Sequence, residues 1–180
     1  DFGYSSTRGH NDGLGQMTSR EKIVFKPIDQ IHPNRMQPRR ALPFKIRPYF
    51  SSSDIESMQY GFEKWLTEVN VERNGDFPLD KYLEGEETHR VTNIEKMDTE
   101  LEQTGSVPKM GAMETAFMTV LDLAASIKRD GLVNPISIAR SGTDDNGSIR
   151  YEIETGERRW LAYHLLNWQY PESGWDKIPT

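Results

Sequence analysis

The sequence has no cysteine among its 180 residues, which excludes disulfide bonds, cysteine nucleophiles and thiolate metal ligands. It also has no apolar run near the roughly 20 residues that span a bilayer as a helix. The first 16 residues lack the apolar stretch of a secretory signal peptide. We therefore expect a cytoplasmic protein without membrane contact. The chain begins without Met and ends without a helical pattern, so we expect a piece of a longer protein.

Basic residues are fewer than acidic ones, 22 against 28, and the net charge of −6 argues against a domain that coats nucleic acid. The acidic excess lies in the middle, where residues 51–120 hold 15 acidic and 6 basic side chains. Residues 1–50 have the opposite balance, with nine basic and four acidic side chains. This distribution predicts an acidic insertion, at about residues 41–111, within a less acidic domain.

The length and composition predict one globular domain with a single core. Residues 1–19 are rich in Gly, Ser, Asn and Asp, which predicts a flexible arm before a domain over residues 20–180. The insertion could form a lid, a partner-binding subdomain, a DNA mimic or, most simply, a surface loop.

Periodic patterns predict the main elements. Apolar residues at spacings of three and four predict one helix after Ser53 or Asp54 and another from Ala112 to a C-cap at Gly131. Alternation of apolar and polar residues predicts a strand over residues 22–28 and a hairpin over residues 135–155. A further helix is predicted after Gly156. Residues 29–34 are typical of a turn, and residues 84–105 of a solvated helix or a loop.

The junction at Gly156 is the strongest candidate for a binding site. A strand followed by glycine and a helix leaves backbone N–H groups free to bind an anion, and the helix dipole favours negative charge there. Arg158 and Arg159 lie in the first turn, where the dipole disfavours a cation by about 0.3–1 kcal/mol each. A bound polyanion would offset this cost, and Glu157 could bind a phosphate-bound Mg²⁺ or orient an arginine. The alternative is an exposed charged turn that pairs with Glu152, Glu154 or the insertion.

Three motifs in this order resemble the N-terminal domain of ParB-type partition proteins. They cover residues 22–40 and 121–170, somewhat under half of the chain. The motifs are Ile28-x-x-Ile31-x-Pro33-Asn34-x-x-Gln37-Pro38-Arg39, Leu123-Ala124-x-Ser126-Ile127-x-x-x-Gly131-Leu132-x-x-Pro135-Ile136 and Tyr151-x-Ile153-x-x-Gly156-Glu157-Arg158-Arg159-Trp160-x-Ala162.

The resemblance implies an α/β domain, a small mixed sheet with packed helices and a helical insertion. It also implies that the domain binds CTP with Mg²⁺ and closes a clamp around DNA, in chromosome or plasmid partition or in transcriptional regulation. It implies a homodimer, a partner partition ATPase, and a DNA-reading region and part of any CTP-hydrolysing machinery beyond this chain. It also assigns site residues. The nucleotide-binding set is Gln37, Arg39, Gly131, Pro135, Ile136, Thr155, Gly156, Glu157, Arg158 and Arg159, with Arg35 and Arg40 expected to contact DNA and Glu157 expected to bind the metal. The family usually has a third arginine where this sequence has Leu161.

Other functions compete with this interpretation. Sulfiredoxin is similar in fold, but its cysteine position is Glu157 here, which excludes that activity. A related nucleotide-dependent kinase for free serine would use Glu157, or a carboxylate near Gln37, as a base. A nuclease would need a carboxylate cluster, for which Glu152, Glu154 and Glu157 are candidates. A module that only binds another protein is the third alternative, and Leu161 favours it.

Overall fold

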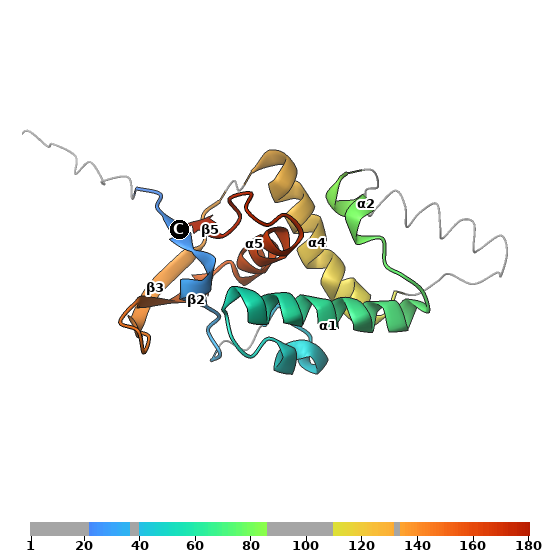
Figure 1. Ribbon diagram of the computed structural model, residues 1–180, viewed down its shortest axis with the longest axis horizontal. Coiled ribbons are helices and arrows are strands. Elements are labelled where there is room, and N and C mark those ends of the chain that lie inside the picture. Colours follow the sequence, from blue (N-terminus) through green and yellow to red (C-terminus); the bar gives the residue numbers. More distant parts are fainter. Residues whose placement is uncertain (1–21, 37–39, 86–109, 132–133) are drawn as a thin grey trace, which may run out of the picture.

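A computed structural model describes residues 22–36, 40–85, 110–131 and 134–180 (Figure 1). The expected arm at residues 1–19 lies outside these ranges. So do Gln37 and Arg39, two of the expected nucleotide-binding residues, and most of the acidic stretch at residues 84–105.

Two small sheets form the β part of the fold. Strand β1 (Phe25–Pro27) pairs antiparallel with β5 (Lys177–Pro179). The second sheet has the order β2-β4-β3, in which β2 (Ile31–His32) runs parallel to β4 (Ile149–Thr155), and β3 (Ser137–Thr143) runs antiparallel to it. This mixed pairing confirms the expected α/β class.

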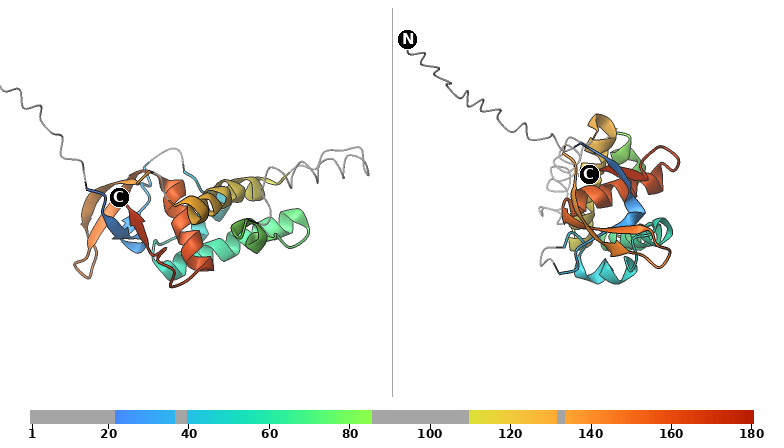
Figure 2. Two further views of the ribbon diagram at one scale, coloured as in Figure 1. Left: turned by 90° about the horizontal axis from the view of Figure 1, so that it is seen from above. Right: turned by 90° about the vertical axis from the view of Figure 1, so that its left-hand side faces the viewer.

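The helical part comprises α1 (Ile55–Arg73), α2 (Leu79–Leu83), α4 (Ala112–Asp130) and α5 (Glu157–Gln169), with two 3₁₀ turns, η1 (Ile28–Gln30) and η2 (Phe44–Tyr49). The strands gather at one end of the molecule and most of the helical part at the other (Figure 2). Helix α4 packs against α1, α2 and α5. Within the described ranges, no helix is long and apolar enough to cross a bilayer.

Helix α1 is part of the main core, although its residues fall within the expected insertion. Its buried side chains include Phe62, Trp65 and Val69, all with 0% exposure. Trp65 also donates its indole proton to the backbone oxygen of Met113 on α4, at 3.0 Å. A surface loop is therefore the wrong description of residues 55–73. Of the two expected caps, Asp54 rather than Ser53 caps α1, by accepting a hydrogen bond from the backbone N–H of Ser57.

Two short strands differ from the sequence-based expectation. The expected turn at residues 29–34 overlaps η1 and contains β2, whose Ile31 pairs with Tyr151 of β4. Near the end of the chain, β5 pairs with β1. Strands of two or three residues carry no readable alternation, and only their distant partners define them.

Candidate functional site

The N-terminus of α5 adopts the geometry that its glycine predicts. Gly156 has φ 104°, a left-handed conformation that favours glycine, and lies between β4 and α5. A Cβ atom here would lie 2.7 Å from Cγ2 of Ile136, so a larger residue would collide with the core. No side chain caps this helix, which leaves the first N–H groups of α5 without an intrahelical or side-chain cap partner. Backbone donors and a helix dipole therefore meet at one point.

A pocket of about 430 Å³ opens at this point. Its lining joins three parts of the chain: the first turn of α5, the segment before η2, and helix α4. The residues are Arg40, Ala41, Leu123, Gly156, Glu157, Arg158 and Arg159. The structure thus brings the four consecutive residues of the predicted anion site together with Arg40. We call this cavity the α5 pocket.

Glu157 faces Arg40 within the α5 pocket. Its Oε1 lies 3.4 Å from Nε of Arg40, and its Oε2 accepts a long hydrogen bond of 3.5 Å from the backbone N–H of Ala41. The arginine paired with Glu157 is thus Arg40, an expected DNA contact. No group of three metal-ligating side chains occurs in the described ranges. Glu157 could serve as a single protein ligand for Mg²⁺, which suits an ion held mainly by phosphate oxygens and water.

The two arginines of the first turn have different surroundings. Nη1 of Arg159 donates to the backbone oxygens of Asn134 and Pro135, both at 2.8 Å, so this residue ties α5 to the segment before β3. Arg158 is exposed, and it has no hydrogen bond or ion pair with any described residue. Arg158 is therefore the cation of this turn that remains available to a ligand.

The other expected nucleotide-binding residues lie around the α5 pocket or away from it. Ile136 is buried beneath Gly156, with 2% exposure, and Pro135 contacts Arg159 through its backbone oxygen. Neither Gly131, the exposed C-cap of α4, nor Thr155 lines the pocket.

Leu161 is fully buried, with 0% exposure. It belongs to the hydrophobic core rather than to the α5 pocket. An arginine at this position would start from the core side of α5, so the leucine here serves packing.

The carboxylates considered for a nuclease do not converge. Glu154 accepts a hydrogen bond from the hydroxyl of Ser137 at 2.7 Å, whereas Glu152 lines a different pocket. Glu157 lies in the α5 pocket. Within the described part of the chain, these groups therefore form no metal cluster.

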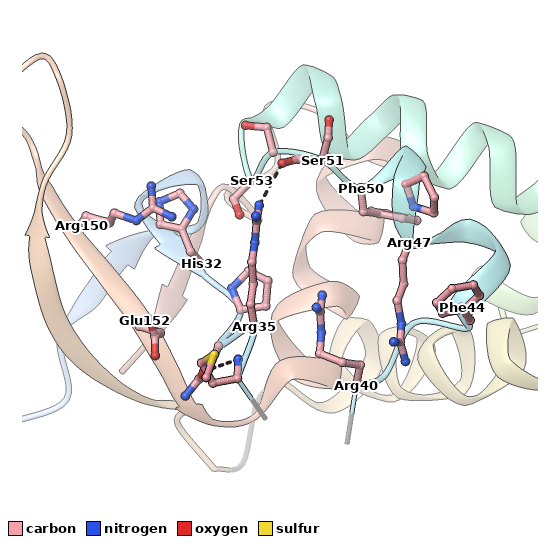
Figure 3. Close-up of a pocket in the computed structure, with 15 residues that line it drawn as sticks. His32, Arg35, Arg40, Phe44, Arg47, Phe50, Ser51, Ser53, Arg150 and Glu152 are labelled. Atoms are coloured by element: carbon pink, nitrogen blue, oxygen red, sulfur yellow. Dashed lines mark hydrogen bonds between the residues drawn. The ribbon is translucent and has the colours of Figure 1, made fainter. Parts of the chain in front are cut away.

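A second and larger pocket, of about 660 Å³, lies between the sheet and η2 (Figure 3). It contains Arg35 and Arg40, the two expected DNA contacts, and also Arg47 and Arg150, which sequence reasoning missed. Arg47 lies in the expected insertion and Arg150 near the start of hairpin strand β4, so only the fold brings them together. We call this cavity the basic pocket.

Comparison with known proteins gives one match. Residues 84–171 match the family model described as the ParB N-terminal domain. This range includes the second and third sequence motifs and leaves out the first, at residues 22–40. No curated protein and no solved structure matches the chain at a significant level.

Proposed function

Over residues 84–171 the chain belongs to the ParB N-terminal domain family, and from this premise we propose that it binds CTP together with Mg²⁺ at the α5 pocket. The observation that carries the proposal is the uncapped N-terminus of α5 with Arg158 exposed beside it. The backbone N–H groups of the first turn would bind phosphate oxygens, and Arg158 would add a charge-assisted contact. Mg²⁺ would neutralise part of the phosphate charge.

Glu157 and Arg40 would act together in this site. Their contact holds residues 40 and 41 against the first turn of α5, so one wall of the pocket depends on it. Arg159 would position the turn rather than bind phosphate, because its guanidinium already donates to two backbone oxygens. A nucleotide-binding role for the remaining residues of the expected set stays a prediction of the resemblance. These residues are Gln37, Arg39, Gly131, Pro135, Ile136 and Thr155.

We further propose that the protein acts in chromosome or plasmid partition, or in related gene regulation, as a homodimer that encloses DNA. A region beyond this chain would read the DNA sequence, and a partition ATPase would be its partner. Arg35 and Arg40 are proposed DNA contacts; Arg40 is already paired with Glu157, so Arg35 is the freer of the two.

Calorimetric titration with CTP, ATP, GTP and UTP, each with Mg²⁺, tests the nucleotide. We expect CTP to bind most tightly. Replacement of Arg158 by Ala should weaken that binding by about 1.5 to 3 kcal/mol, the loss of a hydrogen bond to a charged group. Arg140→Ala is the matched control, because Arg140 is also exposed and lines neither pocket.

Other outcomes point to the alternatives. Preference for ATP or ADP would favour a small-molecule kinase with Glu157 as its base. Absence of binding to all four nucleotides would favour a protein-interaction module. Equal CTP affinity in the Arg158→Ala and Arg140→Ala variants would remove the proposed role of Arg158.

A further inference from the structure

The basic pocket is built by segments that lie far apart in the sequence. Strand β2 and the turn after it form one side, β4 contributes Arg150 and Glu152, and η2 with the residues before α1 closes the other side (Figure 3). Arg40 is the one residue that lines both this pocket and the α5 pocket. Residues 40–53, which supply most of the lining, lie outside the range that matches the ParB N-terminal domain.

Positive charge in the basic pocket is not balanced by its own lining. Four arginines line it, Arg35, Arg40, Arg47 and Arg150, together with one carboxylate, that of Glu152. Arg40 is paired with Glu157. The other three form no ion pair with a carboxylate of any described residue. In a chain with a net charge of −6, such a local excess of cations favours the binding of an anionic ligand.

Two of these guanidinium groups are held in place without being neutralised. Nε of Arg47 donates to the backbone oxygen of Leu42 at 2.9 Å, and Nη2 of Arg35 donates to that of Ser51 at 3.3 Å. Each contact uses a neutral acceptor, so the positive charge remains. A ligand would find these groups partly ordered, which lowers the entropy cost of binding them.

An exposed aromatic ring accompanies the charges. Phe44 is 83% exposed, and the guanidinium carbon of Arg47 lies 5.9 Å from its ring centroid. Met36, which is 91% exposed, also lines the pocket. Arginines that alternate with an exposed aromatic side chain are typical of sites where a base stacks and phosphates pair with guanidinium groups.

We propose that the basic pocket binds a nucleoside with its phosphates, in which the base stacks on Phe44 and the phosphates contact Arg35, Arg47 and Arg150. This site is separate from the proposed CTP site and does not depend on it, because these four residues lie outside the α5 pocket. The same chemistry is offered by a single-stranded nucleic acid and by a free nucleoside triphosphate. The open pocket and its spread of charges favour the strand.

His32 provides a local reporter for the ligand. It lines the basic pocket, and burial lowers its pKa, with Arg150 and Arg35 adding to the effect and Asp29 and Asp144 opposing it. A phosphate beside these arginines would offset their positive charge. Binding should therefore raise the pKa of His32, which can be followed by its imidazole proton resonances in NMR after assignment with His32→Gln.

The test compares two probes that share base and phosphate chemistry: a single-stranded thymidine 15-mer and thymidine triphosphate. Both are titrated into the chain carrying Arg158→Ala, so that the α5 pocket contributes little. We expect the 15-mer to bind and to shift the His32 signals. Arg47→Gln with Arg150→Gln should weaken this binding at least tenfold, whereas Arg140→Gln should not.

Salt dependence and a second variant make the test specific. The paired Arg47 and Arg150 replacements should reduce the slope of log affinity against log salt by about 1.4, or about 0.7 for each phosphate of the single strand that an arginine no longer neutralises. Phe44→Ala should weaken binding of the 15-mer several-fold without changing that slope.

Tighter binding of the triphosphate would identify a free nucleotide as the ligand. Unchanged His32 signals with both probes at millimolar concentration, or equal binding by the paired variant, would overturn the proposal.

Discussion

His164 is an ionisable residue in an apolar place. It lies in the core with 3% exposure, its ring contacts that of Trp160 edge-on at 4.6 Å between centroids, and its Nε2 has no hydrogen-bond partner in the described part of the chain. Its neighbours Trp160, Leu161 and Leu165 on α5 are buried as well. Burial lowers the pKa of His164 from 6.5 to about 3, because the charged imidazolium would lose its water.

Stability should therefore fall as the pH drops from about 6 towards 3. In this range the unfolded state binds a proton at His164 and the folded state does not, so protonation favours unfolding. The slope from this residue approaches about 1.4 kcal/mol per pH unit. Urea unfolding at several pH values, compared between wild type and His164→Leu, measures it.

The difference between the two proteins isolates His164, because both share the titration of the carboxylates. His32→Gln is the matched control. The pKa of His32 is also lowered, but its side chain lines an open pocket rather than the core, so its replacement should remove less of the pH dependence than His164→Leu. A pH dependence in His164→Leu equal to that of the wild type would contradict the argument.

The junction between α1 and α4 shows how one helix caps another. The N-cap of α4 is Gly111, which has no side chain to accept a hydrogen bond. Glu72 of α1 takes this role: its carboxylate accepts from the backbone N–H groups of Met113 at 3.0 Å and Glu114 at 3.1 Å. A Cβ atom at residue 111 would collide with that carboxylate, so the glycine leaves room for the distant cap.

Glu72→Ala should destabilise the protein by about 1 kcal/mol, the usual cost of removing an N-terminal cap. Thermal or urea unfolding would measure the change. Glu63→Ala on the exposed face of α1 is the control, and it should change stability by less than about 0.5 kcal/mol. Equal effects of the two replacements would show that Glu72 does not act as a cap.

Long elements with a repeating apolar pattern could be predicted from the sequence, whereas pairings between distant segments could not. Helices α1, α4 and α5 follow their apolar spacing, and the hairpin of β3 and β4 follows its alternation and turn. The α5 pocket was predictable because Gly156 to Arg159 are consecutive. The basic pocket was not, because Arg47 and Arg150 share no local pattern and meet only when η2 packs beside the sheet.

At the scale of the whole molecule, residues on both sides of position 84 share one core. The family match begins there, yet Phe62 and Trp65 of α1 are fully buried and contact the rings of Trp168 and Phe117. Loss of α1 would expose these rings to water, and burying a large aromatic side chain is worth several kcal/mol.

Residues 84–180 alone should therefore fail to fold cooperatively. The whole chain should show one cooperative unfolding transition on heating, whereas the shorter piece should lack one and should bind a dye that detects exposed apolar surface. Circular dichroism and dye fluorescence test this expectation. A sharp transition in the shorter piece would show that α1 is not required for the core.

The pairing of β1 with β5 determines how the domain would respond to a pulling force. Val24 and Thr180 exchange two backbone hydrogen bonds, at 3.2 and 2.8 Å, at the outer end of this antiparallel pair. Tension applied between residues 22 and 180 would load these bonds one after another and peel the strands apart from that end. The pair should thus act as a mechanical zipper that opens at low force, before the helical core is strained.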